Sequence, residues 1–302
     1  MGFVSLKYDE VFKEVFSCEG VRKQFISDVT GIPLEDIREA RLANSFLRRR
    51  HRRQKQGVLD IAVVLQDGTK VDIELQVAEQ KFWIKRKLFY LARMYGDTLY
   101  SGEDYERLRK CIAISILDFS LTADERYYSS YRLRDKAGRE LTDLFEVHII
   151  ELNKKLTGTG AIEDWIRLFN VERREDLDMI KTMNAGIMEA IGEMRRLSLG
   201  RRLRQRYEEW EKAKRDRRAE DAFVKDQGRA EGMIIGRDQG RAEGIGIGKI
   251  EDILELLEDL GPIPEELRKL VAEQQNLDTL KKWLKLAARV ESVEEFRRQC
   301  RI

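Results

Sequence analysis

Three acids and an amide stand close together in two neighbouring apolar segments. Asp60 lies in VLDIAVVL, and Asp72, Glu74 and Gln76 alternate with apolar residues in VDIELQ. Carboxylate oxygens are the ligands that Mg²⁺ and Mn²⁺ prefer, with water or phosphate filling the remaining positions. If these acids meet in space, the two segments predict a site for a divalent cation.

An Asp-Gly turn between the segments indicates which residues face one another. The odd-numbered positions of both segments carry the apolar residues, and a one-residue slip would turn every side chain to the other face. A three-residue loop that ends in a left-handed Gly68 keeps the odd positions together. This loop pairs Leu65 with Thr69 and therefore Asp60 with Glu74.

Opposed carboxylates repel each other across a strand pair, so a compensating charge is expected. A bound divalent cation is one explanation of the acidic face. A solvated acidic sheet face with Lys70 as its ionic partner is the alternative, and the alternation of residues does not decide between them.

Composition restricts the classes of function. The 302 residues are enough for about two domains with a buried core. Hydrophobic residues make up 42% and charged residues 37%, and the net charge is only +2. Attraction to nucleic acid must therefore come from local clusters of basic residues rather than from a uniform field.

The scarce histidines and cysteines exclude other kinds of site. His51 and His148 are too few for a multi-histidine zinc site. The cysteines form no CxxC motif or disulfide framework, which is typical of a reducing compartment, and no apolar run is long enough to span a bilayer. We therefore expect a cytoplasmic protein without a membrane segment, in which carboxylates perform any catalysis.

Hydrophobic patterns predict a mixed first half and a helical second half. Two short helices are followed by strands near residues 40–47, 58–65 and 69–77, a helix over 82–100, and strands over 110–121 and 145–152. The helix carries a predicted apolar stripe and, opposite to it, Arg86, Tyr90 and Arg93. The stripe consists of Ile84, Leu88, Leu91, Tyr95 and Leu99.

The order of these patterns predicts four segments. They are an α/β domain over residues 1–157, a helical extension over 158–225, a glycine-rich segment over 226–249 and a small helical domain over 250–302. The third segment contains a twelve-residue repeat, KDQGRAEGMIIG and RDQGRAEGIGIG. Glycine at every fourth position destabilises an isolated helix, so we expect this segment to pack on a partner or to act as a flexible spacer.

Several motifs occur in a fixed order along the first half. They are Asp9…Phe12-Lys13, Lys55-Gln-Gly-Val-Leu-Asp60-Ile, Asp67-Gly68, Ile73-Glu74-Leu-Gln76, Lys85-Arg86…Tyr90 and Ile150-Glu151-Leu152-Asn153-Lys154. This ordered set resembles the PD-(D/E)XK nuclease-family transposases, also called recombination-promoting nucleases. The resemblance covers about residues 7–155 closely and the helical remainder loosely.

The resemblance implies a fold and an activity. The fold is a restriction-endonuclease-like α/β fold with an αβββαβ core, followed by a mostly helical C-terminal region. The activity is Mg²⁺- or Mn²⁺-dependent cleavage of DNA. Asp60 and Glu74 match the two metal-binding acids, and the backbone carbonyl of Leu75 is the further ligand that the resemblance implies.

The departure from the superfamily pattern lies at Gln76, where a lysine is usual. An amide can orient water or polarise a phosphate, but it carries no charge. The missing cation could come from Lys13, Lys55 or Arg86, and the sequence does not choose among them. Asp9 is a further candidate to assist the metal site from the first helix.

Basic residues gather just before Asp60 and on the helix that follows the hairpin. A cluster of this density predicts sequence-independent binding of phosphates, although a solvated basic loop is the alternative. Arg86 and Tyr90 could contact the DNA backbone near the metal. The cluster consists of Arg48, Arg49, Arg50, Arg52, Arg53 and Lys55.

The sequence therefore predicts a metal-dependent DNA endonuclease, with recombination, transposase-like activity or phage defence as compatible roles. The alternative is a catalytically silent protein that keeps the fold and binds nucleic acid or regulates a partner. We also expect the helical C-terminal region to form a homo-oligomer, such as a dimer.

Overall fold

The computed structural model describes residues 2–47, 57–97, 99 and 102–300. The chain divides into two compact units, Met1–Glu211 and Lys212–Ile302. Within the described ranges, no helix combines the length and the apolar character needed to cross a membrane. The four segments expected from the sequence stay a prediction.

The first unit contains the helices and strands that position the acids. Its helices are α1 (Asp9–Val15), α2 (Glu19–Thr30), η1 (Leu34–Asp36), α3 (Trp83–Gly96), η2 (Tyr105–Arg107), α4 (Ala161–Phe169), α5 (Arg174–Met179) and α6 (Ala185–Ser198). Its strands are β1 (Ala40–Leu42), β2 (Phe46–Leu47), β3 (Gly57–Val58), β4 (Ile61–Leu65), β5 (Lys70–Gln76), β6 (Cys111–Leu117), β7 (Tyr128–Arg134) and β8 (Glu140–Glu151).

A six-stranded mixed sheet forms the centre of this unit, with the strand order β1-β4-β5-β6-β8-β7. The pairs β1–β4, β4–β5 and β7–β8 are antiparallel, whereas β5–β6 and β6–β8 are parallel. The parallel step from β5 to β6 needs a crossover, which α3 provides. The succession of α2, β1, β4, β5, α3 and β6 confirms the expected αβββαβ core.

The hairpin between β4 and β5 has the predicted register. Ile61 lies opposite Ile73 and Val63 opposite Val71, so odd positions pair with odd positions. Gly68 has φ of 85°, and its amide donates to the Leu65 carbonyl at 3.0 Å. Only glycine adopts this left-handed conformation without strain, so Asp67-Gly68 sets the register that brings the even-numbered acids onto one face.

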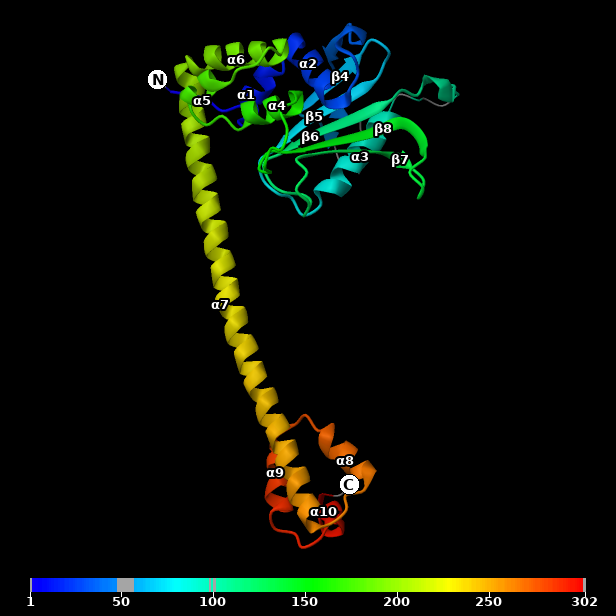
Figure 1. The fold of residues 1–302 in the computed structure, drawn as a ribbon, viewed down its shortest axis with the longest axis vertical. Coiled ribbons are helices and arrows are strands. Elements are labelled where there is room, and N and C mark those ends of the chain that lie inside the picture. Colours follow the sequence, from blue (N-terminus) through cyan, green and yellow to red (C-terminus); the bar gives the residue numbers. More distant parts are fainter. Residues whose placement is uncertain (1, 48–56, 98, 100–101, 301–302) are drawn as a thin grey trace. The chain divides into compact units, whose positions relative to one another are not determined.

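Helices cover the two faces of the sheet unequally (Figure 1). On one face, α1, α2, α4 and α6 pack on the odd residues of β5 and form the main core. Its largest buried side chains are aromatic, including Phe12, Phe16, Phe25, Trp165 and Phe169. On the other face lies α3, which therefore contacts the acidic side of the β4–β5 hairpin.

The buried face of α3 differs from the predicted apolar stripe. Trp83, Lys87 and Leu91 are buried against the sheet, whereas Ile84 and Leu88 are each 53% exposed. The prediction was wrong for these two residues because it assumed that α3 packs on an apolar surface. The surface beneath α3 instead includes buried carboxylates, so a lysine is held there in place of an aliphatic side chain.

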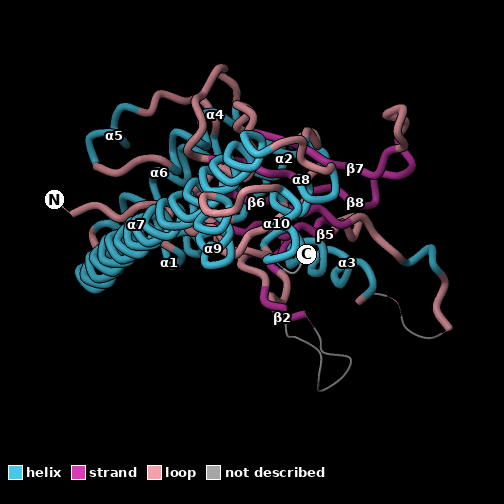
Figure 2. Tube along the Cα trace, turned by 90° about the horizontal axis from the view of Figure 1, so that it is seen from below, coloured by secondary structure: helices cyan, strands magenta, loops and turns pink. Residues whose placement is uncertain are grey.

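The sheet also has an edge strand that the hydrophobic pattern does not predict. This strand, β7, runs beside β8 at the edge of the sheet (Figure 2). In the antiparallel pair, Tyr128 lies opposite Ile150 and Arg132 opposite Glu146. Most of β7 is exposed to solvent. A strand with little buried surface needs no regular alternation of apolar residues, so its sequence resembles that of a loop.

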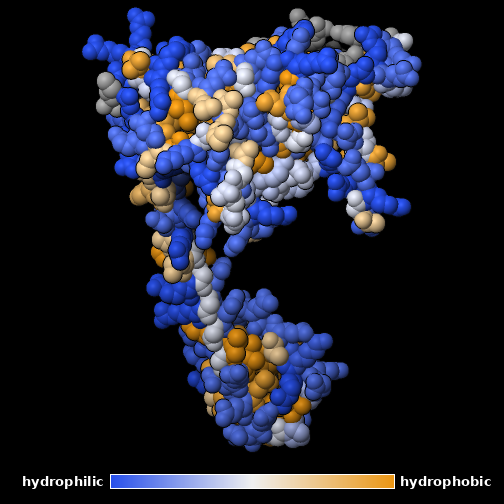
Figure 3. Space-filling view, turned by 45° about the horizontal axis from the view of Figure 1, so that its top comes forward, coloured by the Kyte–Doolittle hydropathy of each residue, from blue (hydrophilic) through white to orange (hydrophobic). Residues whose placement is uncertain are grey.

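The helix α7 (Arg201–Leu260) begins in the first unit and ends in the second. The second unit also contains α8 (Glu265–Ala272), α9 (Leu277–Ala287) and α10 (Val293–Cys300), which enclose a small core with Trp283 and Phe296. Apolar side chains gather on one visible face of this unit (Figure 3). The glycine-rich repeat lies within α7 and is helical.

Candidate active site

Asp60 directly precedes β4, at the end of the β4–β5 pair that lies away from the turn. β4 begins at Ile61, one residue later, and the Leu75 amide donates a hydrogen bond of 3.3 Å to Oδ2 of Asp60. The carboxylate thus accepts from the amide next to Glu74 in sequence. This contact fixes Asp60 close to the acid that the hairpin register places opposite to it.

Glu74 is only 7% exposed, and positively charged or polar donors hold both of its oxygens. Oε1 accepts from Nε2 of Gln76 at 2.7 Å and from Nη2 of Arg86 at 2.9 Å. Oε2 accepts from Nζ of Lys87 at 2.9 Å. Since each carboxylate oxygen has two lone pairs, these contacts leave a lone pair on Oε2.

Lys87 also binds Asp72, so one ammonium joins two acids of β5. Its Nζ lies 2.5 Å from Oδ2 of Asp72, and both residues are 2% exposed. Burial alone would lower the pKa of Lys87, but the charges of Asp72 and Glu74 outweigh it and raise that pKa above its ordinary value. A charged lysine therefore lies in the interior, directly behind Glu74.

Lys87 was not predicted as a site residue, and Asp72 was predicted only as part of the acidic face. One signal could have indicated the lysine. Trp83, Lys87 and Leu91 follow one another at four-residue spacing, so Lys87 shares a helix face with two large apolar residues. A lysine in such a stripe, soon after an acidic strand, predicts a buried ion pair.

The environment of Asp60 favours its protonated form. Burial, followed by the negative charge of Glu74, raises the pKa of Asp60 to about 6, against the opposing effects of the Leu75 amide and of Lys13. The charge of Asp9 contributes in the same direction as that of Glu74. A pair of adjacent acids whose charges are unfavourable together is a feature of functional sites.

Asp9 and Lys13 approach this site from α1. They form an ion pair of 2.8 Å with each other, and the charges of both act on Asp60. The structure therefore brings together the residues predicted for the site, namely Asp9, Lys13, Asp60, Glu74 and Gln76. The Gln76 side chain is hydrogen-bonded to the Glu74 carboxylate.

The donor set fits a hard divalent cation. After the described hydrogen bonds, Asp60 keeps about three lone-pair sites and Glu74 about one. In the part of the chain that the structure describes, no group of three or more histidine, cysteine or acidic side chains is arranged as a metal site. Protein sites for Mg²⁺ commonly supply one or two carboxylates and leave the remaining positions to water and phosphate.

The basic residues predicted to bind DNA are only partly described. Arg86 contacts Glu74 and Gln80, and its side chain is 31% exposed at the edge of the site. Tyr90 is partly buried and packs against a small apolar cluster that includes Leu91 and Met94. Its ring lies 5.9 Å from that of Phe89. The cluster Arg48, Arg49, Arg50, Arg52, Arg53 and Lys55 lies outside the described residues.

Two other polar residues are structural. His148 is buried, with Nδ1 2.9 Å from the Tyr128 hydroxyl and Nε2 3.3 Å from Glu146. Both ring nitrogens therefore have hydrogen-bond partners within the protein. Glu151 accepts hydrogen bonds from the Leu121 amide at 2.5 Å and from Nζ of Lys154 at 2.8 Å. The motif around Glu151 thus fastens the loop after β6 to the end of β8.

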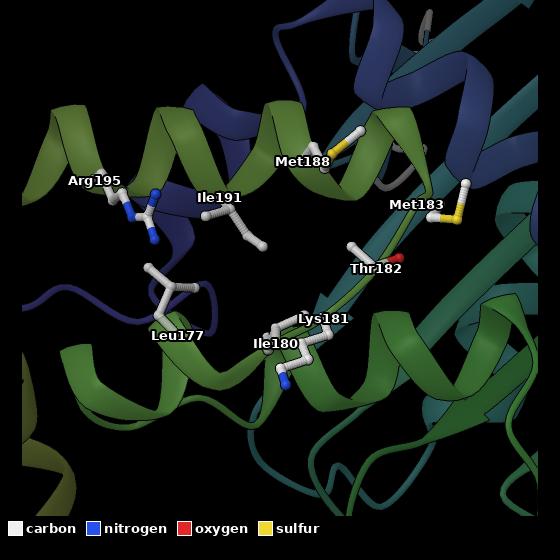
Figure 4. A pocket seen from close by; sticks show the side chains of 8 residues that line it. All are labelled: Leu177, Ile180, Lys181, Thr182, Met183, Met188, Ile191 and Arg195. Atoms are coloured by element: carbon white, nitrogen blue, oxygen red, sulfur yellow. The ribbon is translucent and has the colours of Figure 1, made fainter.

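A cavity of about 550 Å³ lies away from the acids, between α5 and α6 (Figure 4). Apolar side chains and two basic ones surround it, and none of the candidate acids contributes. The lining residues are Leu177, Ile180, Lys181, Thr182, Met183, Met188, Ile191 and Arg195. The cavity and the acidic site are therefore separate features of the first unit.

Comparison with known proteins identifies a family. A family model described as PD-(D/E)XK nuclease family transposase matches residues 6–221. No curated protein and no solved structure matches the chain. The matched range contains Asp60, Glu74 and Gln76 together with the whole six-stranded sheet.

Proposed function

The chain belongs to the PD-(D/E)XK nuclease family transposases, and from this membership we propose that it is a metal-dependent DNA endonuclease that hydrolyses phosphodiester bonds. Members of this nuclease family generally use divalent metal ions and act on nucleic acid. The observation that carries the finer proposal is the position of Asp60. Its carboxylate lies close enough to Glu74 for that negative charge to raise its pKa, and among the described residues it accepts one hydrogen bond, from the Leu75 amide.

We propose that Asp60, Oε2 of Glu74 and the backbone carbonyl of Leu75 hold Mg²⁺ or Mn²⁺. When bound, such a cation lowers the pKa of a water molecule and neutralises the scissile phosphate. Asp60 must be ionised to act as a ligand. Since its pKa is raised to about 6, the site is ready for the cation at neutral pH and above.

The remaining side chains orient these ligands and the substrate. Gln76 donates to Oε1 of Glu74 and thereby leaves Oε2 as the oxygen that would bind the cation. Arg86 binds the same oxygen and is partly exposed, so its guanidinium can also face a phosphate of DNA. Lys13, held by Asp9, adds a positive charge near Asp60.

Binding of the DNA backbone is assigned to the basic cluster before Asp60. Residues of this cluster directly precede β3 in the chain, so a phosphate bound by them would be held only a few residues before Asp60 in sequence. Such binding is electrostatic and independent of sequence, so its affinity should fall steeply with salt. The residues are Arg48, Arg49, Arg50, Arg52, Arg53 and Lys55.

We also propose that α7 associates with α7 of a second copy. A Cβ added at Gly228, Gly236 or Gly244 would meet no atom within 4 Å, and Ile234 is more than half exposed. Each glycine costs a helix roughly 1 kcal/mol relative to alanine. Close approach of a second helix would compensate for these glycines, and size-exclusion chromatography with light scattering should give the mass of a dimer.

A catalytically silent DNA-binding or regulatory protein is the second candidate. One observation favours it: Arg86 and Lys87 already neutralise Glu74 without any metal. The fold could then persist without cutting. The roles in recombination, transposition or phage defence are compatible with either candidate, and the three free cysteines are compatible with a cytoplasmic location.

Cleavage of supercoiled plasmid distinguishes the candidates. We expect the wild-type chain to nick or linearise the plasmid with Mg²⁺ or Mn²⁺, and chelation or Asp60→Ala to abolish this activity. Glu74→Ala should act in the same way. Cleavage that survives both Asp60→Ala and chelation would refute the proposed mechanism, and a wild type that binds DNA without cutting it would favour the silent protein.

A further inference from the structure

β5, the strand that carries Glu74, ends at the uncharged residue Gln76. Gln76 occupies the position where the superfamily pattern has a lysine. Its amide donates to Oε1 of Glu74 at 2.7 Å. An amide cannot supply a positive charge. A cation for this site must therefore come from another element.

Lys87 of α3 meets the geometric requirements. Its Nζ lies 2.9 Å from Oε2 of Glu74, the oxygen that keeps a lone pair, and 2.5 Å from Oδ2 of Asp72. Both acids and the lysine are buried. The short contact with Asp72 fixes the ammonium from behind, so that Lys87 can hold Glu74 in one orientation.

The other cations near the site are less suited to this task. Lys13 pairs with Asp9 at 2.8 Å, and its side chain is 47% exposed. Arg86 binds Oε1, which already accepts from Gln76, and it also contacts Gln80. Among the described residues, Lys87 is thus the buried cation that contacts Oε2 of Glu74, the oxygen proposed to bind the metal.

We propose that Lys87 of α3 is a positioning residue of this nuclease site and that Asp72 is its anchor. The inference rests on the proposed function. Lys87 acts through Glu74: it holds Oε2 where that oxygen and Asp60 can share one cation, and it makes no contact with substrate.

A double variant separates this role from simple neutralisation of Asp72. Lys87→Met alone would leave Asp72 buried without its partner, and the chain could then fail to fold. Asp72→Asn combined with Lys87→Met removes both charges of the pair at once, so neither charge is left buried without its partner. The double variant also keeps the formal charge of the site, so long-range attraction for a cation is unchanged.

The experiment compares the wild type, the double variant and a control, Lys81→Met, in the full chain. Lys81 is an exposed lysine just before α3. Calorimetry measures Mn²⁺ binding without DNA, circular dichroism measures folding, and plasmid cleavage gives kcat and KM. Removal of residues that orient metal ligands typically costs 10- to 100-fold in affinity or rate.

We expect the folded double variant to bind Mn²⁺ about 10- to 100-fold more weakly and to lose kcat with little change in KM, while Lys81→Met behaves as the wild type. If Lys87 only neutralises Asp72, the double variant will bind Mn²⁺ and cut as the wild type does, and the inference is wrong. A wild type that binds no Mn²⁺ refutes the proposed function, and this inference with it.

Discussion

Replacing Asp60 with asparagine should stabilise the metal-free fold while it abolishes cleavage. In the absence of metal, the Asp60 carboxylate is partly buried beside the charge of Glu74, and this raises its pKa from 3.8 to about 6. The asparagine side chain has nearly the same shape as the aspartate, and its amide oxygen can still accept the hydrogen bond from Leu75. The substitution therefore removes an unfavourable charge and keeps the local geometry.

The pKa shift gives the magnitude. A rise of the pKa from 3.8 to about 6 corresponds to ~3 kcal/mol, because one pKa unit is worth about 1.36 kcal/mol. Asp60 is not fully buried, so screening by solvent reduces this value, and we expect about 2 kcal/mol in the free energy of unfolding. For a unit of this size, 2 kcal/mol corresponds to a rise in Tm of about 4–8 °C.

The gain should depend on pH with a definite sign. The folded state binds the Asp60 proton more tightly than the unfolded state, so stability of the wild type falls as pH rises between about 4 and 6. The cost is absent below the unfolded pKa and fully present above the folded one. Asp60→Asn should therefore raise Tm most at pH 8 and much less near pH 4.5.

The assay is thermal unfolding in EDTA at these two pH values. Asp143→Asn is the control, because that acid is 55% exposed and its loss should change stability by less than about 0.5 kcal/mol. An Asp60→Asn variant that melts at or below the wild-type Tm at pH 8 would refute the reasoning, since Asp60 would then not be held at an energetic cost.

Three further predictions concern metal binding by Asp60, the contacts of Glu151 and the glycines of α7. Mn²⁺ affinity of the wild type should fall as pH drops through about 6, because Asp60 must lose its proton to bind metal; calorimetry at pH 5, 6.5 and 8 tests this, and a flat profile contradicts it. Glu151→Gln should lower the free energy of unfolding by about 1–3 kcal/mol, since the carboxylate holds the Leu121 amide and Lys154; denaturant titration measures the loss, and an unchanged midpoint contradicts it. Gly240→Ala should stabilise an isolated α7 by up to about 1 kcal/mol, because alanine favours a helix more than glycine does. The same substitution should weaken a dimer in which the two helices pack on their glycines. Sedimentation experiments measure dimerisation, and tighter dimerisation of the variant would exclude close packing at Gly240.

Local patterns were sufficient for the centre of the fold. The alternation of VDIELQ and the Asp67-Gly68 turn predicted the register that puts Asp60 opposite Glu74, and the structure has this register. The physical reason is that a strand repeats every two residues and a left-handed glycine is required at a fixed place in the loop. Both features are read within about twenty residues.

The missed features depend on contacts between distant segments. β7 pairs through its backbone with β8 and buries little, so its side chains carry no alternating pattern. The stripe predicted on α3 contained Ile84 and Leu88, which are exposed, because apolar residues were assumed to mark the buried face.

The sequence by itself determined the hairpin, the identity of its acids and their common face. Only the tertiary structure decided what lies against that face, namely Lys87 between Asp72 and Glu74. A buried charge is stable only beside its partner, and that partner is on another element. The four-residue spacing of Trp83, Lys87 and Leu91 puts the lysine on one helix face with two apolar residues, but only the packing of α3 on β5 shows which acids it binds.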